Sequence, residues 1–150
     1  MLSSIPDPEI PVVNIREMGM LREVVLTDKG YEVILTPTYT GCPAMGMIEE
    51  DIKERLKENN VFPVTVKLVY DPAWTTDWMS DEAKEKLRKY GIAPPLASAC
   101  NNTDFLLNTI SCPLCGSHET ELVSRFGSTA CKALYKCSSC KEPFEYFKCH

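Results

Sequence analysis

The sequence lacks the features of an exported or membrane-bound chain. Its first residues, MLSSIPDPEIP, have neither the basic flank nor the apolar stretch of a secretory signal. No apolar run approaches the roughly 18 residues that a membrane-spanning helix needs. We therefore expect a soluble, cytoplasmic protein that has no membrane partner.

The chain also lacks an excess of basic residues. Its 16 lysines and arginines stand against 21 aspartates and glutamates, for a net charge of −5. Residues 112–150 carry five basic against four acidic side chains, and residues 1–111 carry 11 against 17. Because binding to nucleic-acid phosphates needs a basic patch, we expect no nucleic-acid partner.

Histidine is scarce, and this scarcity bears on catalysis. The chain has two histidines, and neither precedes residue 118. A cysteine nucleophile is ordinarily activated by a histidine, so a thiol enzyme acting through Cys42 is the least favoured function. We expect the protein not to be an enzyme.

Cysteine, by contrast, is abundant, with eight residues in 150. In a chain without an export signal the thiols stay reduced, and paired cysteines then favour metal binding. CPLCG at 112–116 and CSSCK at 137–141 form two CxxC pairs, whose sulfurs suit one tetrahedral site. Structural zinc is the expected metal, although four thiolates also suit iron or a transiently held iron–sulfur cluster. The predicted ligands are Cys112, Cys115, Cys137 and Cys140.

The remaining cysteines of the C-terminal region are less favoured as metal ligands. Cys131 and Cys149 are candidate additional ligands, but packing is favoured because one tetrahedral site takes four donors. Cys100 has no assigned role. His118 and His150 are expected to be solvated.

The pattern of residues 21–91 predicts an α/β (α+β) domain. Two strands flank Asp28-Lys29-Gly30 as a β-hairpin, and the second of them covers residues 31–39. Residues 44–58 predict an amphipathic helix, and residues 62–70 a further strand, which completes a βαβ unit. A second helix is predicted at 81–90, capped by Ser80 and ended by Gly91.

The expected organisation is a small mixed sheet followed by a C-terminal zinc-ribbon module. The module has strand-like runs in ELVSRF, KALYK and EPFEYFK. The predicted domains are residues 1–95 and 112–150, joined by a linker at 96–111.

Cys42 lies where the topology predicts a site. It follows the strand at 31–39, and the carboxyl ends of parallel strands share one edge of a sheet. The segments DPEIPVVNIREMG and DPAWTTDWM should reach the same edge. Because Pro43 suits the first helical position, Cys42 would be the cap of the helix, where the helix dipole lowers the pKa of a thiol.

Each of these features also has a purely structural interpretation. Cys42 suits the role of a small buried hydrophobic residue equally well. Asp7 and Glu9 can be solvated charges of a first turn, and Trp74 and Trp78 can be aromatic residues that cover the core.

The stretches DPEIPVVNIREMGML, TPTYTGCPAM and DPAWTTDWMSDEAKEKLRKYGIAPP resemble the SufT-type family of iron–sulfur assembly proteins over about residues 5–95. The cysteine-rich extension, FGSTACKALYKC through EPFEYFKC, is similar to the phenylacetate-degradation D (PaaD) branch of that family. The resemblance implies an accessory protein of the phenylacetyl-CoA epoxidase system, which helps iron–sulfur maturation of its reductase component.

The expected partner is therefore a protein client, the iron–sulfur reductase, and a homodimer stays open. A zinc-ribbon adaptor for nucleic acid or protein, without a role in cluster assembly, stays the alternative function. A cluster-transfer or docking site is expected around Cys42. Its predicted residues are Cys42, Asp7, Glu9, Thr38, Thr40, Trp74, Thr75, Thr76 and Asp77.

Overall fold

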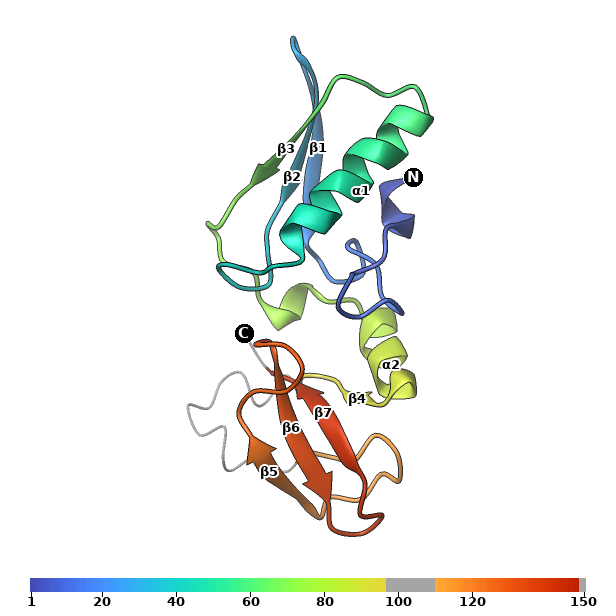
Figure 1. The fold of residues 1–150 in the computed structure, drawn as a ribbon, viewed down its shortest axis with the longest axis vertical. Helices are drawn as coiled ribbons and strands as arrows, with labels where there is room; N and C mark the ends of the chain where they lie inside the picture. Colours follow the sequence, from blue (N-terminus) through green and yellow to red (C-terminus); the bar gives the residue numbers. More distant parts are fainter. Residues whose placement is uncertain (97–109, 149–150) are drawn as a thin grey trace. The chain divides into compact units, whose positions relative to one another are not determined.

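The computed structural model describes residues 1–96 and 110–148 (Figure 1). The chain divides into two compact units, Met1–Ala83 and Lys84–His150. None of the helices in the described stretches is both long and apolar enough to cross a bilayer. The proposed domain boundary at residue 95 stays a prediction.

The first unit contains a three-stranded mixed sheet in the order β1-β2-β3. β1 (Leu21–Thr27) pairs antiparallel with β2 (Gly30–Leu35), and β2 pairs parallel with β3 (Val64–Leu68). The predicted hairpin and βαβ unit are thus confirmed. β2 ends at Leu35 rather than at residue 39, because Pro37 has no N–H to continue a ladder.

The helix α1 (Met45–Glu58) lies along one face of this sheet and contacts β3 (Figure 1). Ile48, Ile52 and Leu56 recur every four residues and are all buried. Burial of each such side chain contributes about 1.5–3 kcal/mol relative to exposure. The periodicity of the sequence therefore places the helix correctly.

The turn between β1 and β2 requires a glycine. Gly30 has a φ of 115°, and a Cβ there would lie 2.4 Å from the backbone oxygen of Pro63. The same oxygen accepts a hydrogen bond of 2.9 Å from the N–H of Tyr31. We predict that Gly30→Ala lowers the free energy of unfolding by about 1–3 kcal/mol, measured by urea denaturation.

Gly46→Ala is the matched control for this substitution. Gly46 lies near the start of α1, and apart from its chain neighbours and the backbone of its own helix no atom lies within 4 Å of the position of its missing Cβ. This change should raise the free energy of unfolding by about 0.5–1 kcal/mol. Equal effects of the two changes would show that the close approach of Pro63 does not matter.

The loop that follows β3 is tied to the N-terminal segment. After η1 (Leu2–Ser4), that segment runs irregularly to β1. The indole Nε1 of Trp74 donates a hydrogen bond of 2.8 Å to the carbonyl of Met18. The N–H of Ser80, just after η2 (Thr76–Trp78), donates one of 2.9 Å to the carbonyl of Glu17.

The second helix has the limits that the sequence predicts. α2 covers Asp81–Tyr90, and Gly91 follows it with a φ of 95°. The N–H of Ala83 donates a hydrogen bond of 3.1 Å to the Ser80 hydroxyl. Ser80 is therefore the predicted cap.

The second unit contains a four-stranded sheet in the order β4-β7-β6-β5. β5 (Thr120–Ser124), β6 (Lys132–Cys137) and β7 (Pro143–Phe147) form an antiparallel meander. All three were expected. β4 (Ile92–Ala93), which pairs parallel with β7, was not expected, since two residues are too short for a recognisable pattern.

The core of this second sheet is small and aromatic. The ring of Tyr135 lies 5.8 Å from those of both Phe144 and Tyr146, measured between centroids. Ala93, Ala133 and the buried sulfurs of Cys112 and Cys137 complete much of the cluster. Because so few apolar groups are buried, we expect this small sheet to need a further source of stability, such as a bound metal ion.

Candidate metal centre and Cys42 site

Two tight turns present the CxxC cysteines. In the first, the N–H of Gly116 donates a hydrogen bond of 2.8 Å to the carbonyl of Cys112. The residue after the second cysteine has a positive φ in both turns, 77° at Gly116 and 66° at Lys141. The two turns are therefore built alike, as expected of paired metal-binding knuckles.

The four predicted sulfurs come together. The Sγ atoms of Cys112, Cys115, Cys137 and Cys140 all lie within 4.8 Å of one another. The distance is 3.8 Å between Cys112 and Cys140 and 3.6 Å between Cys115 and Cys137. A tetrahedron with zinc–sulfur bonds of about 2.3 Å has edges of about 3.8 Å. The donors and their spacing thus fit a tetrahedral thiolate-binding metal ion.

The surroundings favour a thiolate at one of these ligands. Backbone N–H groups of Cys140 and Ser139 lower the pKa of Cys137 to about 6, against the opposing effect of burial. Cys112 and Cys137 are buried, whereas Cys115 is exposed. A hydrogen bond from the Glu142 backbone lowers the pKa of Cys140, but burial and the neighbouring cysteines outweigh it and raise that pKa to about 12. A metal ion would therefore meet one thiolate at neutral pH and displace protons from the other sulfurs.

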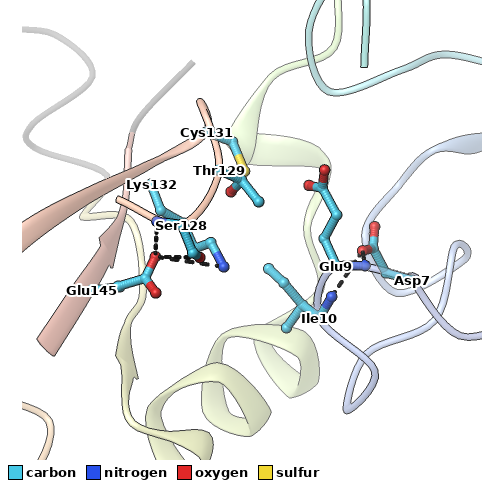
Figure 2. A network of polar contacts seen from close by, with 8 residues as sticks. All are labelled: Asp7, Glu9, Ile10, Ser128, Thr129, Cys131, Lys132 and Glu145. Carbon is cyan, nitrogen blue, oxygen red and sulfur yellow. Dashed lines mark hydrogen bonds and ion pairs between the residues drawn. The ribbon is translucent and has the colours of Figure 1, made fainter. Parts of the chain in front are cut away.

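Cys131 does not belong to this cluster. Its Sγ lies 3.0 Å from the hydroxyl of Thr129 (Figure 2), and its carbonyl accepts a hydrogen bond from the N–H of Lys148. His118 contacts the hydroxyl of Ser111 at 3.0 Å. Among the described residues only the four predicted ligands form such a group. Cys149, Cys100 and His150 lie outside the described residues.

A carboxylate fixes the loop that leads to Cys131. Glu145 on β7 accepts hydrogen bonds of 2.9 and 3.2 Å from the hydroxyl and N–H of Ser128 (Figure 2). It also pairs with Lys132 at 3.5 Å. The loop before β6 is thereby anchored to β7.

Cys42 is not the helix cap that the sequence suggests. α1 begins at Met45, and Ala44 occupies the cap position. The N–H of Met45 donates to the carbonyl of Cys42 at 3.3 Å, which makes residues 42–45 a separate turn before the helix. The thiol is half-buried. Pro43 therefore precedes the helix instead of starting it.

The expected lowering of the Cys42 pKa is wrong. Burial raises the pKa of this thiol, and the nearby carboxylates of Glu9 and Asp7 raise it further. Hydrogen bonds with the Ala44 backbone and the Tyr39 side chain oppose this shift without reversing it. The free chain thus holds a protonated thiol, which disfavours a nucleophile and still allows a metal ligand.

Asp7 is a fixed group of the structure. It is 6% exposed, and its Oδ1 accepts hydrogen bonds of 2.8 and 3.0 Å from the N–H groups of Glu9 and Ile10 (Figure 2). The N-terminal segment is folded around this carboxylate. Asp7 is therefore no solvated charge, whereas Glu9 remains partly exposed.

We predict that alkylation of Cys42 has an apparent pKa above the free value of about 8.5. Glu9→Gln removes one source of repulsion and should lower that pKa, so that alkylation at neutral pH becomes faster. Iodoacetamide labelling followed by peptide mass spectrometry measures the rate at this cysteine alone. Glu50→Gln, an exposed change on α1, is the control and should leave the profile unchanged. A Cys42 pKa below the free value would contradict this account.

The structure places the other predicted site residues unevenly. Glu9 and Asp7 both interact electrostatically with Cys42. Trp74, Thr76 and Thr38 are buried, Thr75 is half-buried, and Thr40 and Asp77 are exposed. The indole N–H of Trp74 bonds to the N-terminal segment rather than to the Cys42 loop.

Two contacts were missed from the sequence. Tyr39 contributes a hydrogen bond to Cys42, and its place three residues before the cysteine was the available signal. Arg22 lies 4.1 Å from the ring centroid of Trp78, a cation–π contact that no local pattern indicates.

In comparisons with known sequences, two parts of the chain match two different family profiles. Residues 1–68 match the profile described as iron–sulfur cluster assembly protein. Residues 98–148 match the profile described as PaaD zinc beta ribbon domain. The predicted resemblance to iron–sulfur assembly proteins with a ribbon extension is confirmed.

Individual relatives agree with these profiles. A protein of Escherichia coli strain K12, named as a putative component of 1,2-phenylacetyl-CoA epoxidase, is 52% identical over 149 residues, covering 99% of this chain and 89% of that protein. The iron–sulfur protein maturation auxiliary factor SufT of Staphylococcus aureus is 35% identical over 80 residues, covering 52% of this chain and 90% of its own length.

A solved structure supports the fold of the first part. The domain of unknown function DUF59 from Bacillus anthracis superposes with a TM-score of 0.53 at 32% identity. The match covers 57% of this chain and 83% of that one.

Proposed function

Because the chain belongs to the PaaD family, with an iron–sulfur assembly domain and a zinc β-ribbon, we propose that it matures the iron–sulfur cluster of the phenylacetyl-CoA epoxidase reductase. The observation that carries this proposal is the near full-length match to the Escherichia coli relative that is named for this epoxidase. The relative from Staphylococcus aureus is itself named a maturation auxiliary factor. The client is then a protein, and the chain acts as an accessory factor rather than as an enzyme.

Cys42 is the proposed cluster-transfer or docking residue. Its thiol is half-buried beside two carboxylates, so that it is protonated in the free chain. An approaching iron ion or cluster brings positive charge, which displaces the proton and makes the sulfur a ligand. Glu9 and Asp7 would then face a cation. Their negative charge, which disfavours a bare thiolate at Cys42 in the free chain, would favour the state in which the metal is bound.

The ribbon is proposed to hold structural zinc. Thiolate ligands and closed tetrahedral geometry are typical of such sites, and when bound the metal supplies folding energy. In this proposal zinc keeps the ribbon folded for recognition of the client, while any iron or cluster in transit is cargo handled at Cys42.

Deletion of the gene in a phenylacetate-degrading host tests this function. We expect the reductase to accumulate with a largely empty cluster site, while an unrelated iron–sulfur protein of the same cells stays fully loaded. Anaerobic purification and iron and acid-labile sulfide analysis measure both. A fully loaded reductase in the deletion strain would refute the proposal.

A further inference from the structure

The first unit leaves part of its apolar sheet face uncovered at the β1 edge. In the described residues β1 has one strand neighbour, β2, and its other edge is open beyond Leu21, whose N–H donates a hydrogen bond to the carbonyl of Ile15. Val24 lies opposite Val33, and Leu26 lies opposite Tyr31. Val33 is fully buried, but Val24, Leu26 and Tyr31 are 45%, 70% and 37% exposed. The apolar face of the sheet therefore extends from the buried core to the solvent-exposed edge at β1.

A groove of about 400 Å³ adjoins this edge. The sheet contributes Leu21, Val24 and Tyr31 to its lining. The last turn of α1 contributes Leu56, and the segment after this helix contributes Val61. Apolar surface dominates the lining. Such a groove beside an open strand suits the side chains of an added extended segment.

Arg16 gives the groove a positive charge. It is the charged side chain among the residues that line this groove, which include no carboxylate. Arg16 also borders a second pocket, which Glu17 and Glu82 line. Residues 1–83 carry seven basic side chains against fifteen acidic ones, yet the Arg16 guanidinium has no carboxylate partner among the described residues. An unpaired arginine in an acidic unit is complementary to an acidic ligand.

We propose that this groove binds an extended segment of a partner protein, which adds to the open edge of β1. Its alternate side chains would be aliphatic and enter the groove, and an aspartate or glutamate would reach Arg16. Strand geometry supports this pattern, because every second side chain of an added strand faces the same way.

This surface is separate from the Cys42 site within the first unit. Tyr31 lies at the start of β2, whereas Cys42 follows the end of that strand. Binding at the groove and chemistry at Cys42 can thus be tested independently. Failure of one proposal would leave the other intact.

A phage-displayed library of random short peptides, panned against the full chain, tests the proposal. We expect enrichment of alternating aliphatic residues with one acidic residue. Arg16→Gln should weaken binding of the selected peptides about threefold to tenfold, and only when their acidic residue is present. Val24→Lys should abolish binding, because it places a charge on the apolar edge.

Val123→Lys is the matched control. Val123 is also an exposed valine on an edge strand, β5, and its change should leave peptide binding unaltered. No enrichment, or binding that survives both Arg16→Gln and Val24→Lys, would overturn the proposal. A dimer that Val24→Lys dissociates would also overturn it, because a second copy would then occupy the groove.

Discussion

Cys112→Ser and Cys140→Ser are each expected to lose about one metal ion per chain and to unfold the ribbon. The four sulfurs lie within 4.8 Å of one another, and the aromatic core beside them is small. Metal binding to zinc-finger peptides provides apparent free energies of about 10–16 kcal/mol, far more than such a core supplies. The measurement is metal content together with near-ultraviolet circular dichroism of the tyrosine-rich sheet.

Cys131→Ser is the matched control for these changes. Cys131 is a buried cysteine of the same unit, but it lies outside the four-sulfur group. Its replacement should retain the metal and the spectrum, with only a modest loss of stability. A ribbon that keeps its native spectrum after complete chelation would contradict the structural role of the metal.

Cys42→Ala is expected to abolish epoxidase activity in cells while leaving the chain folded. The change removes one half-buried sulfur and its hydrogen bonds with the Ala44 backbone and the Tyr39 side chain, but the main-chain hydrogen bonds from Cys42 to Tyr39 and from Met45 to Cys42 remain. The expected loss of stability is therefore small, about 1–2 kcal/mol or less. If Cys42 is the transfer or docking ligand, its loss should stop delivery of loaded reductase.

Cys42→Ser separates sulfur chemistry from shape. Serine keeps a polar group of similar size but is a poor ligand for iron, so it should be as inactive as alanine. Activity is measured in cells that lack the native gene and carry each variant. Ribbon metal content should remain at the wild-type level in both variants. Activity with serine but not with alanine would indicate that packing or hydrogen bonding, and not ligation, is the role of this residue.

Local patterns were sufficient to predict most of the elements. The four-residue spacing of Ile48, Ile52 and Leu56 located α1, and the two CxxC pairs located the four sulfurs that the structure brings together. The strand β4 was missed, because two residues carry no periodicity and depend on pairing with β7.

The chemistry of Cys42 was harder to predict for a physical reason. Its pKa depends on burial and on Glu9 and Asp7, which lie more than thirty residues earlier in the chain. Local sequence indicated a helix start, but the turn at residues 42–45 moves that start to Met45. A local turn thus displaced the cap, whereas burial and the carboxylates of a distant segment decided the sign of the pKa shift.

The role of Cys42 in cluster delivery is tested by the iron and acid-labile sulfide content of the reductase. The reductase is purified anaerobically from cells that carry either the wild-type chain or Cys42→Ala, with both chains present at equal levels. We expect a loaded reductase with the wild-type chain and a largely empty one with the variant, while the variant retains its ribbon metal. Equal cluster content in the two preparations would show that Cys42 is not needed for cluster delivery and would place the functional surface elsewhere on the chain.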